Sequence, residues 1–235
     1  IGCEDVKIYD LISQRPVGDG AGRVVFEYGS TTDFDQLSIA MQGYDTVFHF
    51  AANPNVCPQS YDPHFMHGTL ATNSVLKAML RSGVHKIVFA SSSVVYGDTD
   101  SLDPIPETAP MEPISLYGAS KVAGEAMIRA YCSVYGMRAL ILRFANIIGP
   151  SPTHGILHKW RKVLREDPER LKVLGDGHQS KSYLHVSDCT DAIFWILRCK
   201  TDFGIKRGFV DVFNIGNVDT IEISEIAKMM VKKFG

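Results

Sequence analysis

The sequence lacks several features that would assign it at once to a broad class of proteins. None of its apolar runs reaches the ~18 residues of a membrane-spanning helix, and its first residues lack the basic-then-apolar plan of a signal peptide. The net charge is only −2 with both signs mixed, which gives no reason to expect nucleic acid or an anionic membrane as a partner. Internal repeats and low-complexity tracts are also missing. These absences predict a soluble cytoplasmic protein.

The number and spacing of the cysteines argue against both disulfides and metal centres. The five cysteines lie at positions 3, 57, 132, 189 and 199, an odd number without C-x-x-C spacing. Several lie inside apolar segments, which favours buried reduced thiols in a cytosolic protein. We therefore expect no metal site.

What the sequence does contain is an alternation of short β-branched or aromatic runs with helical stretches. At 235 residues and 45% hydrophobic composition, the chain can bury a sizeable core. Near-continuous apolar strands separated by helices are typical of a parallel sheet covered on both faces. The sequence thus predicts an α/β fold with a doubly wound, Rossmann-like parallel sheet. Its strands are expected at residues 6–10, 23–27, 46–51, 86–90 and 139–144, and its helices at about 34–41, 70–82 and 120–135.

The character of the sequence changes from Ile148 onward. A loop rich in Gly and Pro leads into a charged helix, Gly175 and Gly177 mark a turn, and Asp188 is expected to be the N-cap of a later helix. The chain is therefore expected to divide into residues 1–148, to which 184–217 return, and a smaller region at 149–235. The expected elements here are helices at about 156–165, 188–198 and 223–234, and strands at 183–186 and 212–215.

Tyr117 and Lys121 are the most informative pair in the sequence. Four residues apart, they lie one above the other if the segment is helical. A lysine cation one turn from a phenol favours the phenolate, so Tyr117 is expected to act as a base below its free pKa of about 10. Taken alone, the Tyr-x-x-x-Lys pattern occurs often by chance and favours a surface pair on an amphipathic helix.

The residues upstream of this pair favour the catalytic interpretation. The strand at 86–90 runs into Ser91-Ser92-Ser93, and Val95-Tyr96-Gly97 follows. The order of strand, serine run, Pro-rich loop and Tyr-x-x-x-Lys helix resembles the extended short-chain dehydrogenase/reductase superfamily. Within it, the chain is most similar to the NAD-dependent nucleotide-sugar epimerase/dehydratase branch, and there to the UDP-glucose 4-epimerases. The resemblance covers essentially all 235 residues.

The resemblance implies that residues 1–148 bind NAD and that 149–235 form a small, mainly substrate-binding region. It also implies that a first strand and a G-x-x-G-x-x-G turn are absent from this chain, ahead of the strand at 6–10. Gly18, Gly20 and Gly22 come after that strand, so we expect them to form a flexible turn. Without its first strand, the sheet should lack a central element.

The resemblance also implies the catalytic residues. Counting back from Val95-Tyr96-Gly97, the family's catalytic Ser/Thr is Ser92, which would act with Tyr117 and Lys121. The last two would also contact the nicotinamide end of NAD. The alternative for the serines is backbone hydrogen bonding at a strand end.

Several strand-end residues are expected to bind the cofactor. Asp10 suits hydrogen bonds to a ribose and would repel a 2′-phosphate, which implies NAD rather than NADP; a turn or capping role is the alternative. Ala51 and Ala52 are small enough for a cofactor to approach the backbone. Ser91 is expected beside the nicotinamide or the sugar. His49 lies inside an apolar strand and is expected to be a buried core residue.

Three further residues are expected to bind a nucleotide-sugar substrate. Ser93 neighbours Ser92, and Asn146 follows a strand where relatives contact the sugar diphosphate. Lys181 replaces the family's diphosphate-binding arginine, keeping the charge but losing the bidentate fork. Gly68 and Ser30 also depart from family residues near the cofactor.

The two residues after Ser92 indicate the reaction type. Ser93 and Val94 stand where family dehydratases carry Asp-Glu, which eliminate water with an additional acid and base. Oxidation and reduction at one carbon remain, which predicts a 4-epimerase acting through a transient 4-keto sugar. Another oxidoreductase or dehydratase of the family, a reductase or synthase, or a non-catalytic NAD-binding regulator are the alternatives. Relatives often dimerise through the Tyr-x-x-x-Lys helix, which implies a homodimer.

Overall fold

The computed structural model of the protein describes residues 5–11, 23–53, 63–98, 104–150, 152, 155–200, 203 and 205–234. Its strands are β1 (Asp5–Asp10), β2 (Arg23–Tyr28), β3 (Thr46–His49), β4 (Lys86–Ser92), β5 (Arg138–Phe144), β6 (Asn146–Ile148), β7 (Ser180–His185), β8 (Val210–Ile215) and β9 (Thr220–Glu222). Its helices are α1 (Phe34–Ala40), α2 (Ala71–Ser82), α3 (Leu116–Tyr135), α4 (Ile156–Glu166), α5 (Val186–Cys199) and α7 (Ile223–Phe234), with a π-helix η1 (Phe65–Leu70) and a 3₁₀-helix η2 (Ser93–Tyr96).

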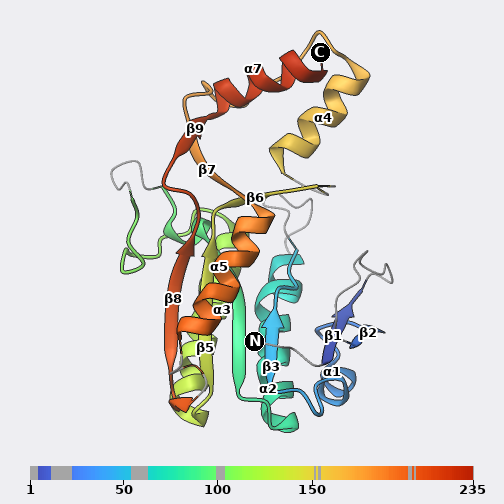
Figure 1. Ribbon diagram of the computed structural model, residues 1–235, viewed down its shortest axis with the longest axis vertical. Helices are drawn as coiled ribbons and strands as arrows, with labels where there is room; N and C mark the ends of the chain where they lie inside the picture. The colour runs from blue at the N-terminus through green and yellow to red at the C-terminus, as the bar shows by residue number, and fades with distance from the viewer. Residues whose placement is uncertain are drawn as a thin grey trace.

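A four-stranded parallel sheet forms the centre of the fold. Its order is β3-β4-β5-β8, with every neighbouring pair parallel. Helices α2 and α3 lie on one face of this sheet and α5 lies on the other (Figure 1). The predicted doubly wound α/β fold is therefore confirmed.

The near-continuous apolar character of β4 and β5 follows from burial on both faces. In β4, Ile87 and Phe89 pack in one core cluster with α2 and α3, whereas Val88 between them packs with α5 in a second cluster. In β5, Ile141 faces the first cluster and Leu142 the second. Because side chains alternate along a strand, only an uninterrupted apolar run can fill both layers.

Strands β1 and β2 form a second parallel sheet beside α1. Among the described residues, this pair is not hydrogen-bonded to the four-stranded sheet, and β3 and β1 face one another across the gap in Figure 1. The expectation that the sheet lacks a central element stays a prediction. The glycine turn with Gly18, Gly20 and Gly22 lies outside the described residues.

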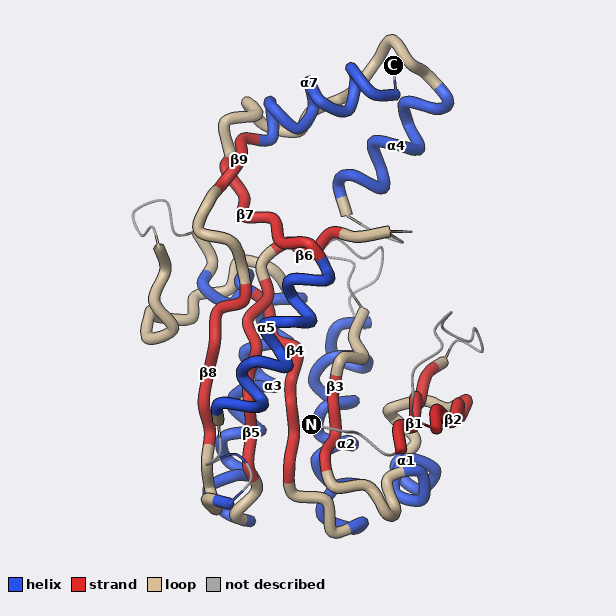
Figure 2. Tube along the Cα trace, viewed as in Figure 1, coloured by secondary structure: helices blue, strands red, loops and turns tan. Residues whose placement is uncertain are grey.

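A small lobe stands beyond the end of the main sheet at which β5 leads into β6 (Figure 2). In it, β6 pairs parallel with β7, and β7 pairs antiparallel with β9. Helices α4 and α7 pack together around a separate core that includes Trp160, Ile223 and Ile226. The proposed division into 1–148, with 184–217 returning, and 149–235 stays a prediction.

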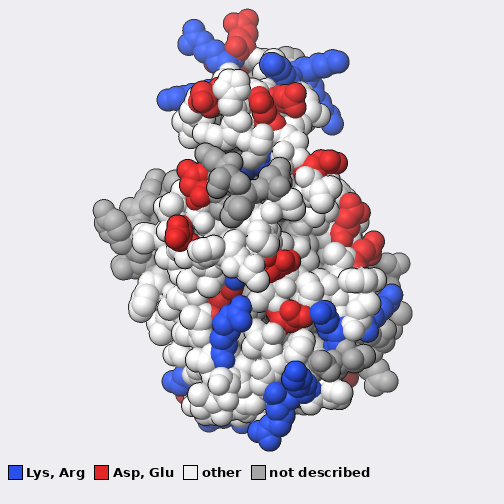
Figure 3. Space-filling model, turned by 90° about the vertical axis from the view of Figure 1, so that its left-hand side faces the viewer, with Lys and Arg blue, Asp and Glu red and all other residues white. Residues whose placement is uncertain are grey.

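Lys and Arg side chains are interspersed with Asp and Glu on the face drawn in Figure 3, including the small lobe at its top. Among the described helices, none combines the length and apolarity that a membrane crossing requires. On the face drawn in Figure 3, the small net charge of −2 thus corresponds to a mixture of positive and negative side chains rather than to a lack of charged ones.

Several element boundaries differ from the expected ones, each for a local reason. Helix α3 begins at Leu116 rather than at 120, because the hydroxyl of Ser115 accepts a hydrogen bond from the Gly118 amide at 3.0 Å. The expected N-cap at Asp188 is wrong: α5 begins at Val186, and the ring of His185 caps it. The three-residue strands β6 and β9 were not predicted, because so short a segment has no measurable periodicity.

Candidate functional site

Lys121 is held beneath the first turns of α3. Its side chain is only 4% exposed, and its Nζ donates to the carbonyl oxygen of Ala90 in β4 at 2.6 Å. The same nitrogen lies 4.9 Å from the ring centroid of Phe89 and 5.7 Å from that of Tyr117. The capping of α3 by Ser115 places Tyr117 in the first turn of the helix, directly over this ammonium group.

Ser92 completes the group at the carboxyl end of β4. Its hydroxyl is hydrogen-bonded to the phenol of Tyr117, and its Oγ also accepts from the Val94 amide that starts η2 at 3.4 Å. The structure thus brings together all three residues that the sequence predicts to be catalytic. Ser93 follows as the first residue of η2.

Burial dominates the acid–base properties of the pair on α3. The pKa of Tyr117 is raised by burial, and the hydrogen bond from Ser92 opposes this by favouring the phenolate. The expectation that Tyr117 has a pKa below its free value is therefore wrong for the protein alone. Burial also lowers the pKa of Lys121 from 10.5 to about 8, partly offset by the negative charge of Glu125. At neutral pH the site presents an ammonium group and two hydroxyls.

The π-helix η1 forms the wall of the site next to Tyr117. Just before it, His64 is 3% exposed and packs edge-on against Tyr117, with 5.8 Å between the ring centroids. Gly68 allows η1 to approach α3, because a Cβ there would lie 2.7 Å from the Oγ of Ser120. No pattern in the sequence predicts this place for His64, since a single histidine outside any motif carries no signal. π-Helical turns occur frequently at functional sites.

The expected cofactor residues lie at the ends of neighbouring strands. Asp10 is the last residue of β1, and Ala51 and Ala52 follow β3 by two and three residues. The carboxyl ends of parallel strands share one edge of a sheet, where open α/β sheets bind ligands. The hydroxyl of Ser91 donates to Glu125 at 2.6 Å, so its expected cofactor contact stays a prediction.

His49 is a core residue, as predicted. It is 3% exposed, and its Nε2 lies 3.0 Å from the Thr72 hydroxyl. Burial, and secondarily the charge of Lys121, lowers its pKa from 6.5 to about 3. His49 therefore stays neutral at physiological pH.

The expected substrate residues Asn146 and Lys181 lie on the adjacent strands β6 and β7. Asn146 donates to the carbonyl oxygen of Ser182 at 3.0 Å, and the register sets it opposite Tyr183, two residues beyond Lys181. Both side chains are exposed. Their contact with a diphosphate stays a prediction.

The cysteines of the described ranges are free thiols. Among the described residues, Cys132 and Cys189 are buried free thiols and Cys199 is an exposed one, while positions 3 and 57 lie outside them. Within the described ranges no three His, Cys, Asp or Glu side chains gather as a metal site would require.

Comparison with known proteins identifies the family. The sequence profile of the NAD-dependent epimerase/dehydratase family matches residues 5–216. The UDP-glucose 4-epimerase of Azospirillum brasilense is 36% identical over 212 residues, which cover 81% of this chain and 60% of that enzyme. The chain thus spans well under two thirds of that relative's length.

Solved structures show the same similarity. A crystal structure of UDP-galactose 4-epimerase superimposes with a TM-score of 0.82 at 35% identity and covers 97% of this chain and 74% of its own. A double mutant of DesIV, a dTDP-glucose 4,6-dehydratase from Streptomyces venezuelae with NAD bound, superimposes with a TM-score of 0.83 at 25% identity, over 99% of this chain and 72% of its own. The chain belongs to the NAD-dependent epimerase/dehydratase family.

Proposed function

We propose that the full protein is an NAD-dependent nucleotide-sugar 4-epimerase that interconverts UDP-glucose and UDP-galactose. The observation that carries this proposal is the group formed by Ser92, Tyr117 and Lys121 at the carboxyl end of β4. Two hydroxyls and an ammonium group in this arrangement can move a proton to and from a sugar hydroxyl. Relatives named UDP-glucose and UDP-galactose 4-epimerase support the substrate class.

The residues around this group fit NAD. Asp10 and Ala51 are exposed and Ala52 is half-buried, so this edge of the sheet offers a carboxylate for a ribose and small side chains for close backbone approach. We propose that Asp10, Ala51, Ala52, Ser91, Tyr117 and Lys121 hold the cofactor. When bound, NAD accepts a hydride from the sugar carbon and returns it.

The chain's own residues perform the proton transfer. Tyr117 takes the proton from the C4 hydroxyl in its phenolate form, which is the minor form at neutral pH and is favoured by the hydrogen bond from Ser92. Ser92 then holds the C4 oxygen as its proton leaves. Lys121 supplies positive charge beneath the ring. Burial raises the pKa of Tyr117, so the phenol holds the proton that it has taken until the C4 oxygen takes it back in the second half of the reaction.

Inversion at C4 requires that the 4-keto sugar turn over while its nucleotide stays bound. We propose that Asn146 and Lys181, on the small lobe, hold the diphosphate, and that Ser93 contacts the sugar. A sugar held mainly through its diphosphate can present either face. The full protein is expected to act as a cytoplasmic homodimer, which light scattering after size-exclusion chromatography would test.

The residues after Ser92 support epimerisation over elimination. Ser93 and Val94 begin η2, and neither can transfer protons as a carboxylic acid does. The structural similarity to a dTDP-glucose 4,6-dehydratase keeps that reaction as the second candidate. A non-catalytic NAD-binding protein is less consistent with the complete set of three residues.

Incubating the full-length protein with UDP-glucose, UDP-N-acetylglucosamine and dTDP-glucose, followed by NMR of the anomeric protons, tests this function. We expect gluco and galacto signals that approach a fixed ratio from either side, with no reaction for Tyr117→Phe. A methyl doublet from a 6-deoxy product, or NADH accumulating with substrate consumption, would replace the epimerase with a dehydratase or dehydrogenase.

A further inference from the structure

Three successive turns of α3 each contact one residue at the carboxyl end of β4. Tyr117 is hydrogen-bonded to Ser92, and Lys121 donates to the carbonyl oxygen of Ala90 at 2.6 Å. Four residues further along, Glu125 accepts from the hydroxyl of Ser91 at 2.6 Å. Residues spaced by four lie on the same face of a helix, so Glu125 continues the row that the catalytic pair begins.

Glu125 is a fully buried carboxylate, 0% exposed, with an equally buried partner on β5. Arg143, 2% exposed, donates from Nε to one carboxylate oxygen at 2.9 Å and from Nη2 to the other at 2.7 Å. An unpaired charge at such a place would be strongly destabilising, whereas this bidentate geometry satisfies both carboxylate oxygens.

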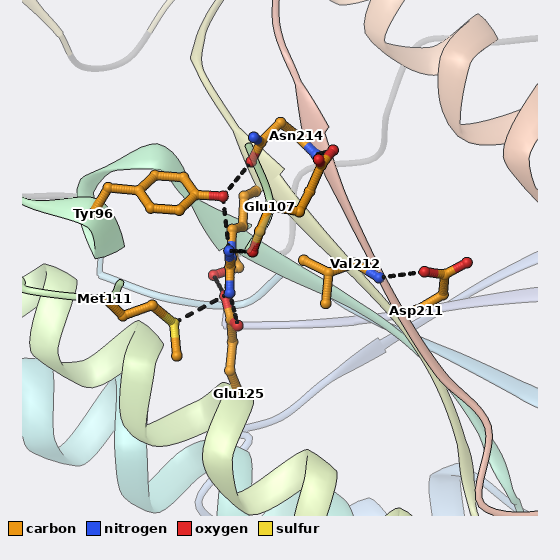
Figure 4. Close-up of polar contacts among 9 residues, drawn as sticks. Tyr96, Glu107, Met111, Glu125, Asp211, Val212 and Asn214 are labelled. Carbon is orange, nitrogen blue, oxygen red and sulfur yellow. Dashed lines mark hydrogen bonds and ion pairs between the residues drawn. The ribbon is translucent and has the colours of Figure 1, made fainter. Parts of the chain in front are cut away.

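The arginine also ties this pair to the loop that separates Ser92 from Tyr117 in the sequence. Its Nη1 donates to the Tyr96 hydroxyl at 2.7 Å and to the Glu107 carbonyl oxygen at 2.9 Å. Figure 4 shows Tyr96, Met111 and Glu125 converging on this point, with Asn214 beyond Tyr96. The Tyr96 hydroxyl in turn donates to Asn214 of β8 at 2.7 Å. Glu125 therefore rests on a rigid polar base rather than on a mobile surface.

We propose that Glu125 is a positioning residue of the site, held by Arg143, which fixes the strand end that carries Ser92 and keeps Lys121 in its charged form. This rests on the proposed function for its effect on turnover. Other groups face Lys121 as well: Tyr117 from α3, neutral His49 from β3, and the Ala90 carbonyl and Phe89 ring from β4. None of those four groups carries a negative charge at neutral pH. Glu125 supplies the negative charge that favours the Lys121 ammonium.

Glu125→Gln in the full-length protein is the direct test, because it keeps a hydrogen-bond acceptor and the shape while removing the charge. The titration of the Lys121 ammonium is followed by NMR of isotope-labelled lysine side chains, assigned with Lys121→Arg. We expect the midpoint to fall below its wild-type position. Glu166→Gln, an exposed change in the small lobe, should leave it unchanged.

The direction of the shift separates positioning from a merely structural role. If the substitution only loosened the packing, water would reach Lys121 and its midpoint would rise toward the ~10.5 of a solvated lysine. A rise, or no change in a folded variant, would overturn the proposal. Glu125→Asp keeps the negative charge, so the Lys121 midpoint should stay near its wild-type position even if the melting temperature falls.

Two further measurements keep the result decisive. If Glu125→Gln fails to fold because Arg143 is left unpaired, Glu125→Gln combined with Arg143→Met removes both charges, and the Lys121 midpoint should still fall. On a nucleotide sugar, we expect kcat to drop at least tenfold with KM within about threefold in the single variant. The titration needs no turnover, so a wild-type protein inactive on every sugar would reject the proposed function while the NMR result still judges Glu125.

Discussion

Lys121 is deeply buried although it carries a charge, and burial of a charged group costs stability. Burial lowers its pKa from 10.5 to about 8, so at neutral pH the folded protein carries a charge that it holds less favourably than water does. A shift of this size corresponds to about 3 kcal/mol of lost stability at neutral pH. The ammonium group that we propose for the chemistry therefore weakens the fold, as is common at functional sites.

Lys121→Met should make the protein more stable at pH 7 while abolishing turnover. Below pH 8 the lysine is charged in both folded and unfolded protein, so the native state bears the full penalty. From pH 8 to about 10.5 the unfolded protein binds more protons, and wild-type stability rises with pH. At pH 7 we expect the free energy of unfolding of Lys121→Met to exceed that of the wild type by about 2 kcal/mol, because the lost hydrogen bond to Ala90 offsets part of the gain. Since wild-type stability rises with pH in that window, this difference should shrink across it.

Denaturant unfolding at pH 7 and pH 10 measures this difference. Lys159→Met, at an exposed position on α4, serves as the control and should show no such pH-dependent gain. A Lys121→Met protein less stable than wild type at pH 7 would contradict the expected loss of stability from burying the Lys121 charge.

Tyr117→Phe should remove the acid–base group while keeping the ring that packs against His64. We expect kcat to fall about 10²- to 10⁴-fold, with NAD and nucleotide-sugar binding within a few-fold. Steady-state kinetics and calorimetry give the two quantities. Tyr131→Phe on the same helix removes a hydroxyl that is bonded to Asn73, and should leave kcat unchanged. More than about a tenth of wild-type kcat in Tyr117→Phe would assign the proton transfer elsewhere.

Asp10 should give the full protein a preference for NAD over NADP. Its carboxylate, at the end of β1, favours ribose hydroxyls and repels a 2′-phosphate. Asp10→Ala should narrow the ratio of the two dissociation constants, and Asp5→Ala at the other end of the strand should not. Equal affinities in the wild type would remove Asp10 from the site.

At the scale of elements, the first turn of α3 holds the chemistry together. Ser115 caps the helix, Tyr117 lies in that turn, and η1 packs against it through the close approach at Gly68. A helix start has unpaired amides and frays more easily than the interior. The position of Tyr117 thus depends on a cap that makes no contact with a substrate.

Ser115→Ala should therefore affect both stability and rate. Loss of the bond to the Gly118 amide should lower the free energy of unfolding by about 1 kcal/mol and reduce kcat several-fold by loosening Tyr117. Denaturant unfolding and kinetics provide the measurements. Ser133→Ala, an exposed change near the other end of α3, should alter neither. An unchanged kcat in a destabilised Ser115→Ala would show that the cap does not position Tyr117.

At the scale of the whole molecule, the sequence predicts best where one periodic pattern extends over many residues. The parallel strands of the main sheet and the helix Ile223–Phe234 lie where expected, because burial on two faces or one leaves a clear pattern. The proximity of Ser92, Tyr117 and Lys121 was also predicted, since strand end and helix are adjacent parts of one unit.

The features that were missed depend on contacts between distant segments. Nothing local marks Glu125 as the partner of Arg143, although a charged residue within apolar β5 is a signal that could have been used. The pKa of Tyr117 was predicted in the wrong direction because burial, its largest cause, arises only when η1 and α3 pack together.

The whole protein should lose stability in mild acid through His49. Its pKa is about 3 in the folded state and 6.5 when exposed, so the unfolded protein binds an additional proton between these values. Stability from this residue is complete above pH 6.5 and falls as the pH drops toward 3, by on the order of 5 kcal/mol. Unfolding free energies of His49→Gln should vary less with pH over that range, whereas exposed His67→Gln should follow the wild type. Parallel curves for His49→Gln and wild type would contradict this.

The contacts that Tyr117, Lys121 and Glu125 of α3 make with the end of β4 also limit where residues can be inserted or deleted. Each residue added to a helix rotates all that follow by about 100°, so one insertion between Tyr117 and Glu125 would turn Lys121 or Glu125 away from Ala90 and Ser91. No substitution elsewhere can restore that phase; only a compensating deletion within the same two turns can. Homologous genes should therefore differ in length in the loop before Ser115 and hardly ever between residues 117 and 125.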